Sequence, residues 1–246
     1  RPYMARKRLR PGIAMAHHMH TFETGAALAE ALATRVASAL AAAIAAKGEA
    51  TLAVSGGSTP KAFFEALSAC KLDWSKVKIT LVDERFVPAD NARSNHLLVA
   101  THLLKNEAVS AEFVPLYRPE ATIEDAATAA SGIIPGMSEP FDVAILGMGT
   151  DGHTASFFPG GDHLADALDL SKPRRVMTME APGAGEARLT LSFSALQDAG
   201  LLVVHIEGAE KKTVLDKALS GTDEADMPIR AVLERAATVP DIYWAP

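Results

Sequence analysis

The sequence predicts a three-layer α/β fold, in which a mostly parallel sheet is covered by helices on both faces. Short apolar runs alternate with longer amphipathic segments over the whole chain, which is the pattern of repeated strand–helix units. The run Leu201–Ile206 has the apolar character of a central parallel strand, because such strands are buried on both faces. Polar, glycine-rich loops follow the apolar runs that end at Val54, Val82 and Leu146, and parallel sheets bind ligands at such strand ends.

The individual elements follow from residue periodicity and from helix start and stop signals. Gly48 provides a stop for the first, alanine-rich helix, and Pro60 suits the first helical position of the second, with Ser58 or Thr59 as its cap. The predicted helices span Phe22–Lys47, Pro60–Ala69, Ser94–Leu104, Ile123–Ser131 and Glu210–Leu219. The predicted strands span Thr51–Val54, Val77–Val82, Phe141–Leu146, Arg174–Met179, Arg188–Leu191, Leu201–Ile206 and Thr238–Trp244. Loops within the same domain are expected at Phe158–Ser171 and Ala181–Glu186.

Composition narrows the classes of protein. A length of 246 residues fits one large α/β domain or two small ones. The net charge of -6 argues against nucleic acid as a partner, because a phosphate backbone requires a basic face. A single cysteine, Cys70, excludes an internal disulfide and suits a reducing compartment. No window approaches the roughly 18 apolar residues of a membrane span, so no membrane association is expected.

The N-terminal residues 1–20 are predicted to form a flexible basic tail, ahead of a single domain over residues 21–246. The segment Arg1–Arg10 is basic, but the run after it is too short and polar for the apolar region of a signal sequence. His17, His18 and His20 could bind a metal adventitiously, although a frayed tail is the favoured interpretation. No second cluster has metal-ligand spacing, so no metal site is expected.

The loop after the strand Thr51–Val54 has the character of a phosphate cradle. It consists of Ser55, Gly56, Gly57, Ser58 and Thr59. The two glycines allow close approach of the backbone to a ligand, the hydroxyls add donors, and the next helix N-terminus offers free N–H groups with partial positive charge. A plain capped turn is the alternative, but the density of glycine and serine favours anion binding.

The loop after Leu146 matches the dinucleotide pattern Gly-x-Gly-x-x-Gly with Gly147, Gly149 and Gly152. A dinucleotide fold needs a long helix after this loop, yet a Pro-Gly-Gly sequence follows within a few residues. Asp151 also places a negative charge where a pyrophosphate would lie. Binding of NAD is therefore disfavoured. A serine-nucleophile hydrolase is disfavoured too, because no Gly-x-Ser-x-Gly sequence is present.

The same loop presents His153 beside Asp151 at a strand end. Histidine titrates near neutral pH, with an ordinary pKa of about 6.5, and can take a proton from water. A carboxylate could orient the imidazole, although a spacing of two residues does not guarantee the contact. The alternative is a histidine that only satisfies the loop backbone.

Further charged residues follow other strands. Asp83 and Arg85 follow the strand Val77–Val82 and would face the same cleft, unless they form a surface salt bridge. Lys211 lies in a first helical turn, where the helix dipole does not call for a cation, so a ligand role is as plausible as a surface one. Arg188 is a further candidate. Together these loops point to an enzyme that binds a small phosphorylated ligand.

Six segments in order resemble the 6-phosphogluconolactonase family of the pentose phosphate pathway. The segment around Asp151-Gly-His153, continued by Thr-Ala-Ser and then Phe-Pro, is the most specific of them. Together the segments extend over residues 54–233. They are Val54–Pro60, Asp83–Pro88 with Ser94-Asn95, Leu146–Pro159, Arg188–Leu191, Gly208–Lys211 and Pro228–Leu233.

The resemblance implies a modified Rossmann-like fold, no cofactor, a cytosolic location and hydrolysis of 6-phospho-D-glucono-1,5-lactone. It also implies roles for single residues. Ser55 to Thr59, Arg188 and Lys211 would hold the 6-phosphate, and Asp83 would lie in the substrate site. His153 would be the general base, oriented by Asp151. Arg85, or backbone N–H groups near Gly56 or Gly149, would stabilise the oxyanion, although Arg85 could equally bind phosphate or pair with Asp83.

Two other functions stay open at this level. Glucosamine-6-phosphate deaminases resemble this chain in the Ser-Gly-Gly-Ser-Thr and Asp-Gly-His pieces, but they continue with a catalytic glutamate, where Thr154–Pro159 offers no carboxylate. A non-catalytic phosphosugar sensor would keep the cradle but should carry a partner domain, and none is visible. A monomer or a small homo-oligomer is expected, with the sugar phosphate as the only ligand.

Overall fold

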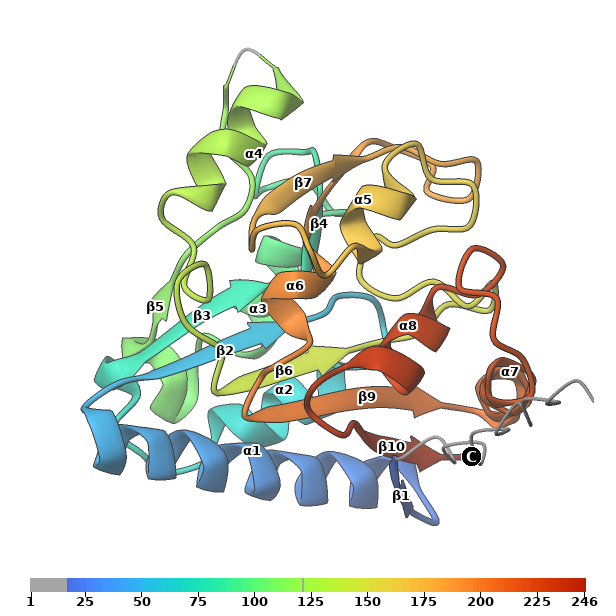
Figure 1. The fold of residues 1–246 in the computed structure, drawn as a ribbon. Coiled ribbons are helices and arrows are strands. Elements are labelled where there is room, and N and C mark those ends of the chain that lie inside the picture. Colours follow the sequence, from blue (N-terminus) through green and yellow to red (C-terminus); the bar gives the residue numbers. More distant parts are fainter. Residues whose placement is uncertain (1–16, 121) are drawn as a thin grey trace, which may run out of the picture.

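A seven-stranded parallel sheet forms the centre of the molecule in this computed structural model, which describes residues 17–120 and 122–246 (Figure 1). The strand order is β1-β10-β9-β6-β2-β3-β5, and each neighbouring pair is parallel. Parallel strands need crossover connections, so helices fall on both faces and the predicted three-layer fold is confirmed. The strands are β1 (His18–Thr21), β2 (Ala50–Val54), β3 (Val77–Leu81), β5 (Glu112–Phe113), β6 (Val143–Leu146), β9 (Leu201–Glu207) and β10 (Asp241–Ala245).

The helices divide between the two faces of this sheet. Figure 1 shows α1 running along one side of the sheet, and α6 and α8 on the other side. The long helix α1 packs against α2 and against strands β2, β6, β9 and β10. The helices are α1 (Gly25–Lys47), α2 (Lys61–Ser68), α3 (Asn95–His102), α4 (Ile123–Ser131), α5 (Leu164–Leu168), α6 (Phe193–Leu196), α7 (Ala209–Leu219) and α8 (Ile229–Arg235), with short 3-10 turns η1 (Trp74–Lys76) and η2 (Asn106–Ser110).

Both ends of α1 follow from local chemistry. The Thr24 hydroxyl accepts a hydrogen bond from the Ala27 N–H at 3.1 Å, and Gly48 ends the helix in the left-handed conformation with φ +85°. The predicted stop is confirmed, whereas the start lies three residues after Phe22. By length and composition alone α1 could span a membrane, which corrects the expectation that no window reaches that length.

A second, antiparallel sheet is the main departure from the predicted fold. The strands predicted at Arg174–Met179 and Arg188–Leu191 exist as β7 (Val176–Met179) and β8 (Arg188–Leu191), but they pair with β4 (Asp83–Arg85) in a sheet of their own. Asp83–Arg85 were expected in a loop after the strand that ends at Val82. Pairing with β8 satisfies this backbone, and the charged side chains enter a polar network described below.

Several other helices and strands differ from the predicted ones where contacts between distant parts of the chain decide the structure. His18, Met19 and His20 belong to edge strand β1 rather than to a tail, because β10 pairs with them along its length. The helix α5 lies within the stretch Phe158–Ser171 that was expected to be a loop, and the sequence analysis did not predict α8. The basic segment Arg1–Arg10 lies outside the described residues.

The helix α2 begins one residue later than predicted. Pro60 is its N-cap residue, and neither Ser58 nor Thr59 caps it through a side chain. The prediction of a side-chain cap is therefore wrong. The Lys61 N–H donates only to the Ser58 carbonyl, at 3.4 Å, so no side chain occupies the N–H groups of the first turn of α2.

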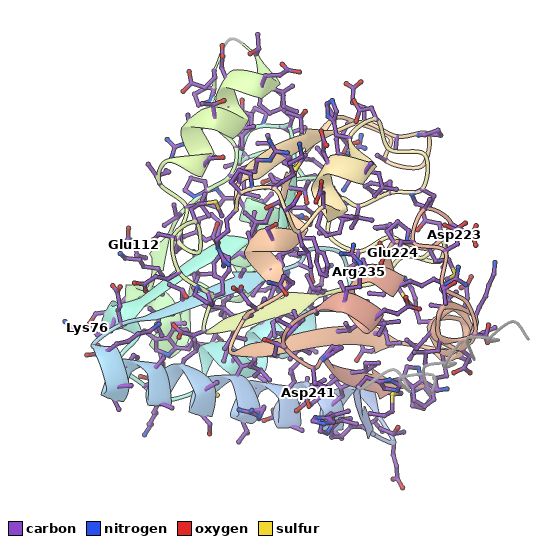
Figure 2. All side chains as sticks on the ribbon, viewed as in Figure 1. Lys76, Glu112, Asp223, Glu224, Arg235 and Asp241 are labelled. Atoms are coloured by element: carbon purple, nitrogen blue, oxygen red, sulfur yellow. The ribbon has the colours of Figure 1, made fainter. Side chains whose placement is uncertain are left out.

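Buried Arg230 fastens α8 to the end of α7. Its guanidinium donates to the backbone oxygens of Lys217, Ala218 and Asp223 at 3.0–3.1 Å, and its residue is only 5% exposed. Figure 2 labels Asp223, and beside it the exposed pair of Glu224 with Arg235 on α8. The neighbouring Ile229 N–H donates to the Gly152 carbonyl oxygen at 2.8 Å, so α8 also supports the loop that carries His153.

We expect Arg230→Met to lower the free energy of unfolding by about 3 kcal/mol, because it removes the three hydrogen bonds by which a buried guanidinium ties α8 to the end of α7 and to Asp223. Lys212→Met is the matched control, since it removes only an exposed pair with Asp216 on α7. That variant should cost less than about 0.5 kcal/mol. Urea unfolding followed by circular dichroism measures both, and equal losses would contradict the anchoring role of Arg230.

Candidate active site

A cavity of about 250 Å³ opens at the carboxyl ends of β2, β6 and β9. It lies where the fold class predicts a ligand site, since the three parallel strands deliver their loops to one edge. Asp151 is the one predicted site residue that is not part of the cavity wall. The others line it together: Ser55, Gly56, Gly57, Ser58, Thr59, Asp83, Arg85, Gly149, His153, Arg188 and Lys211.

The contact between Asp151 and His153 is present. Asp151 Oδ1 lies 2.5 Å from His153 Nδ1 and also accepts from the His153 backbone N–H at 3.0 Å. Burial raises the pKa of Asp151, but the hydrogen bonds from His153 outweigh it and hold this pKa below its ordinary value of 3.8. Asp151 is therefore a carboxylate at neutral pH, and it fixes the tautomer that carries a proton on Nδ1.

The glycine at position 149 makes room for this pair. A Cβ atom there would lie 2.1 Å from His153 Nδ1 and 2.7 Å from Asp151 Oδ1, so no other residue fits without displacing the imidazole. The Gly149 N–H donates to the His153 carbonyl at 2.9 Å, and Gly152 turns the chain at φ +82°. The dinucleotide-like glycine spacing thus builds a tight turn that presents a histidine.

An aromatic ring joins His153 to a buried cation. The imidazole stacks on Phe158 with ring centroids 4.3 Å apart, and the Arg188 guanidinium lies 5.2 Å from the centre of the same ring. Arg188 comes from β8, so the second sheet contributes directly to the site. Stacking restricts the imidazole to one plane, which adds to the orientation that Asp151 imposes.

The predicted phosphate cradle lies at the N-terminus of α2, on the cavity wall. Gly57 adopts φ +87°, and a Cβ on Gly56 would overlap the Asn95 amide at 2.0 Å. Asn95 begins α3, and its amide also donates to the Asp83 carbonyl at 3.1 Å. The cradle is therefore shaped by close packing against α3, while the uncapped N–H groups of α2 remain available to an anion.

Two further cations face the cavity. Lys211 donates from Nζ to the Met148 carbonyl, which ties α7 to the His153 loop. Burial lowers the pKa of Lys211 below its ordinary value of 10.5, although Glu210 and Asp151 act in the opposite direction. Burial likewise lowers the pKa of Arg188, opposed by Asp83, yet a guanidinium stays charged at any physiological pH.

Asp83 pairs with Arg188 rather than with Arg85. Its Oδ2 lies 3.6 Å from Arg188 Nη1 and accepts from the Ser156 hydroxyl at 2.7 Å. The Arg85 guanidinium instead donates from Nη1 to the Arg93 carbonyl at 2.7 Å. The expected alternative of a pair between Asp83 and Arg85 is thus not formed, and Arg85 is held at the cavity wall by backbone.

Glu84 braces this part of the site, although the sequence analysis gave it no role. Its fully buried carboxylate accepts from the backbone N–H groups of Arg85, Asn95 and His96 at 2.8–2.9 Å. Burial raises the pKa of Glu84, against the lowering effect of these hydrogen bonds. The carboxylate therefore fixes the first turn of α3 to β4, and with it the positions of Asn95 and Arg85.

Several residues of the cavity wall were not predicted as site residues from the sequence. Asn95 appeared only as part of a resembling segment, and Thr154 hydrogen-bonds the Gly147 carbonyl at 2.8 Å to close the loop. His205 also lines the cavity, although the run that contains it was interpreted as apolar core. Across residues 17–120 and 122–246, no group of three or more His, Cys, Asp or Glu side chains has the arrangement of a metal site.

Known proteins match this chain over nearly its whole length. The family model described as glucosamine-6-phosphate isomerases/6-phosphogluconolactonase matches residues 23–244. A 6-phosphogluconolactonase of Rhizobium meliloti (strain 1021) is 64% identical over 232 residues, which cover 94% of this chain and 100% of the relative. A 6-phosphogluconolactonase of Mesorhizobium japonicum is 49% identical, covering 99% of this chain and 100% of the relative.

A solved structure agrees with the sequence relatives. The crystal structure of a 6-phosphogluconolactonase from Shewanella baltica OS155 has a TM-score of 0.91 and 41% identity, and the match covers 96% of this chain and 100% of that chain. The resemblance inferred from the six segments is thereby confirmed over nearly the whole length. The chain belongs to the family of glucosamine-6-phosphate isomerases and 6-phosphogluconolactonases.

Proposed function

We propose that this chain hydrolyses 6-phospho-D-glucono-1,5-lactone to 6-phospho-D-gluconate, the second step of the oxidative pentose phosphate pathway, with His153 as general base. The observation that carries the proposal is the 2.5 Å contact of Asp151 with His153 Nδ1 at the cavity wall. Because Nδ1 is committed to the carboxylate, Nε2 is the nitrogen that takes a proton from water. The relatives that share the domain carry the name of this activity.

The 6-phosphate is proposed to bind at the Ser55–Thr59 loop, in the same cavity that His153 lines. The loop Ser55–Thr59 supplies backbone N–H groups, two glycines without side chains and the N-terminus of α2. Lys211 and Arg188 supply positive charge from two other elements. A phosphate monoester carries up to two negative charges, so these groups give the substrate one orientation and direct its lactone ring toward His153.

In the proposed reaction, water loses a proton to His153 Nε2 while its oxygen attacks the lactone carbonyl carbon C1. The negative charge that develops on the carbonyl oxygen requires hydrogen-bond donors, for which Arg85 and the backbone near Gly56 or Gly149 are the candidates at the cavity wall. Breaking the bond between C1 and the ring oxygen opens the lactone. The protonated imidazole then returns its proton to the leaving oxygen, and Asp151 stabilises the transient positive charge.

The deaminase alternative is not favoured. The residues after His153 are Thr154 to Pro159, and the two polar ones among them are already engaged: the Thr154 hydroxyl donates to the Gly147 carbonyl and the Ser156 hydroxyl to Asp83. No carboxylate stands where a deaminase has its glutamate. A non-catalytic sensor is likewise not favoured, because it would not need the pair of Asp151 with His153. A cofactor-free reaction, the cytoplasmic location and a monomer or small homo-oligomer remain predictions.

We expect the purified protein to hydrolyse freshly generated 6-phosphogluconolactone faster than the spontaneous rate, measured by pH-stat or by coupling to 6-phosphogluconate dehydrogenase. Glucosamine 6-phosphate should release no ammonia. A rate equal to the uncatalysed background would refute the proposal, and ammonia release would transfer it to the deaminase reaction.

Replacing His153 with Ala should lower kcat by roughly 10²- to 10⁴-fold with little change in KM, because general-base catalysis is lost while the phosphate grip remains. His163→Ala is a matched control, since that histidine is exposed and contacts Thr178 instead. Thermal unfolding verifies that both variants fold. Full activity in folded His153→Ala would show that another group is the base.

Asp151 should stay ionised throughout the acidic limb of the activity profile. The folded state lowers the pKa of Asp151 below 3.8, so this carboxylate stays charged at mildly acidic pH. The stability that its charged form contributes to the fold is lost only as pH falls through that lowered pKa. The logarithm of kcat/KM should therefore fall with a slope of one from neutral to mildly acidic pH. A slope of two above pH 4 would mean that Asp151 titrates together with the base.

A further inference from the structure

One polar side chain in the cavity has no role in the reaction described above. His205 lies near the end of β9, within the otherwise apolar run Leu201–Ile206, and pairs in register with Tyr243 of β10. Its residue is only 4% exposed, yet it forms part of the cavity wall. Central strands of a parallel sheet usually carry aliphatic side chains, which bury no polar atoms. A buried histidine there costs free energy unless its ring nitrogens are hydrogen-bonded.

The imidazole lacks a hydrogen-bond partner within the part of the chain that the structure describes. Its Nε2 atom is buried and makes no hydrogen bond, and Glu207 Oε1, the nearest carboxylate oxygen, stands 3.8 Å away. That separation is too long for a hydrogen bond. Because buried polar groups are nearly always satisfied, a histidine that lines the cavity and keeps an unpaired ring nitrogen points to a partner that arrives with the ligand.

The surroundings of His205 indicate which part of the ligand this is. The ring packs edge-on against Phe63 of α2, with centroids 6.1 Å apart. The helix α2 begins at the cradle loop Ser55–Thr59, and the chain after β9 leads directly to Lys211. His205 therefore lies between the two elements that carry the proposed phosphate-binding groups, and all of them line one cavity.

We propose that His205 is a phosphate-binding residue, whose imidazole N–H donates to an oxygen of the 6-phosphate held by the Ser55–Thr59 loop. The inference rests on the proposed function for the identity of the ligand. In the bound state the imidazole gains the acceptor that it lacks, and the phosphate gains a donor from β9 besides those of α2 and α7. His205 thus selects phosphorylated over unphosphorylated sugar lactones and leaves the hydrolytic step unchanged.

The test compares His205→Phe, which keeps a ring but removes the donor, with His205→Gln, which keeps a donor. A hydrogen bond to a charged group is worth about tenfold in affinity. His205→Phe should raise KM for the phosphorylated lactone about tenfold without lowering kcat, and should weaken binding of 6-phosphogluconate in calorimetry by the same factor. His205→Gln should recover most of both losses.

Unphosphorylated glucono-1,5-lactone separates recognition from packing damage. Its kcat/KM should be the same in wild type and His205→Phe, since it has no phosphate to lose, whereas a distorted site would hydrolyse both lactones less well. Glu207→Gln is the matched control and should leave kcat and KM unchanged for both lactones. If His205 acted only through a structural pair with Glu207, this variant would instead show the same losses as His205→Phe.

Equal KM values and equal 6-phosphogluconate affinities in folded wild type and His205→Phe would overturn the inference. A spectroscopic readout adds to this: a ring-nitrogen resonance of ¹⁵N-labelled His205 should shift when 6-phosphogluconate binds, and unmoved ring resonances count against the contact. Failure of the proposed function looks different. In that case wild type would not turn over the lactone at all, while calorimetry would still report whether 6-phosphogluconate binding depends on His205.

Discussion

Parallel pairing of β6 with both β2 and β9 is the constraint on which the site depends. Leu52 and Ala53 of β2 pair with Val143 and Ala144 of β6, and the register continues from Leu146 to Val204 in β9. All three strands point the same way, so their carboxyl ends deliver the cradle loop, the His153 loop and α7 to one edge. Residues about a hundred positions apart in sequence therefore share a cavity of about 250 Å³.

Around that edge the protein buries charge at a cost and offsets it with hydrogen bonds. Glu84 is fully buried but accepts from three backbone N–H groups, and Asp83 is paired with Arg188 and Ser156. An isolated buried charge would cost several kcal/mol, so such pairing is what the fold requires. The result is a set of groups whose positions are fixed before substrate arrives, which is the condition for electrostatic catalysis.

Close packing of backbone gives the site its shape. At Gly56 a side chain would overlap Asn95, and at Gly149 it would overlap the imidazole of His153. A glycine-rich loop of this spacing is usually interpreted as a nucleotide-binding loop, but these two glycines have a different function. They admit a neighbouring side chain of the protein itself, whereas a dinucleotide loop admits the pyrophosphate of a ligand.

The sequence by itself determined the fold class and most of the site. Alternating strand and helix patterns and the capping residue Gly48 are local signals, and the cradle loop and the Asp151-Gly-His153 turn are each contained in a few consecutive residues. Only the tertiary structure decided that β4, β7 and β8 form a separate antiparallel sheet, that Asp83 pairs with Arg188, and that Glu84 holds Asn95 over Gly56. It also placed His205 at the cavity wall without a partner. These facts join residues that are distant in the chain, and neither periodicity nor local propensity carries information on which distant groups meet.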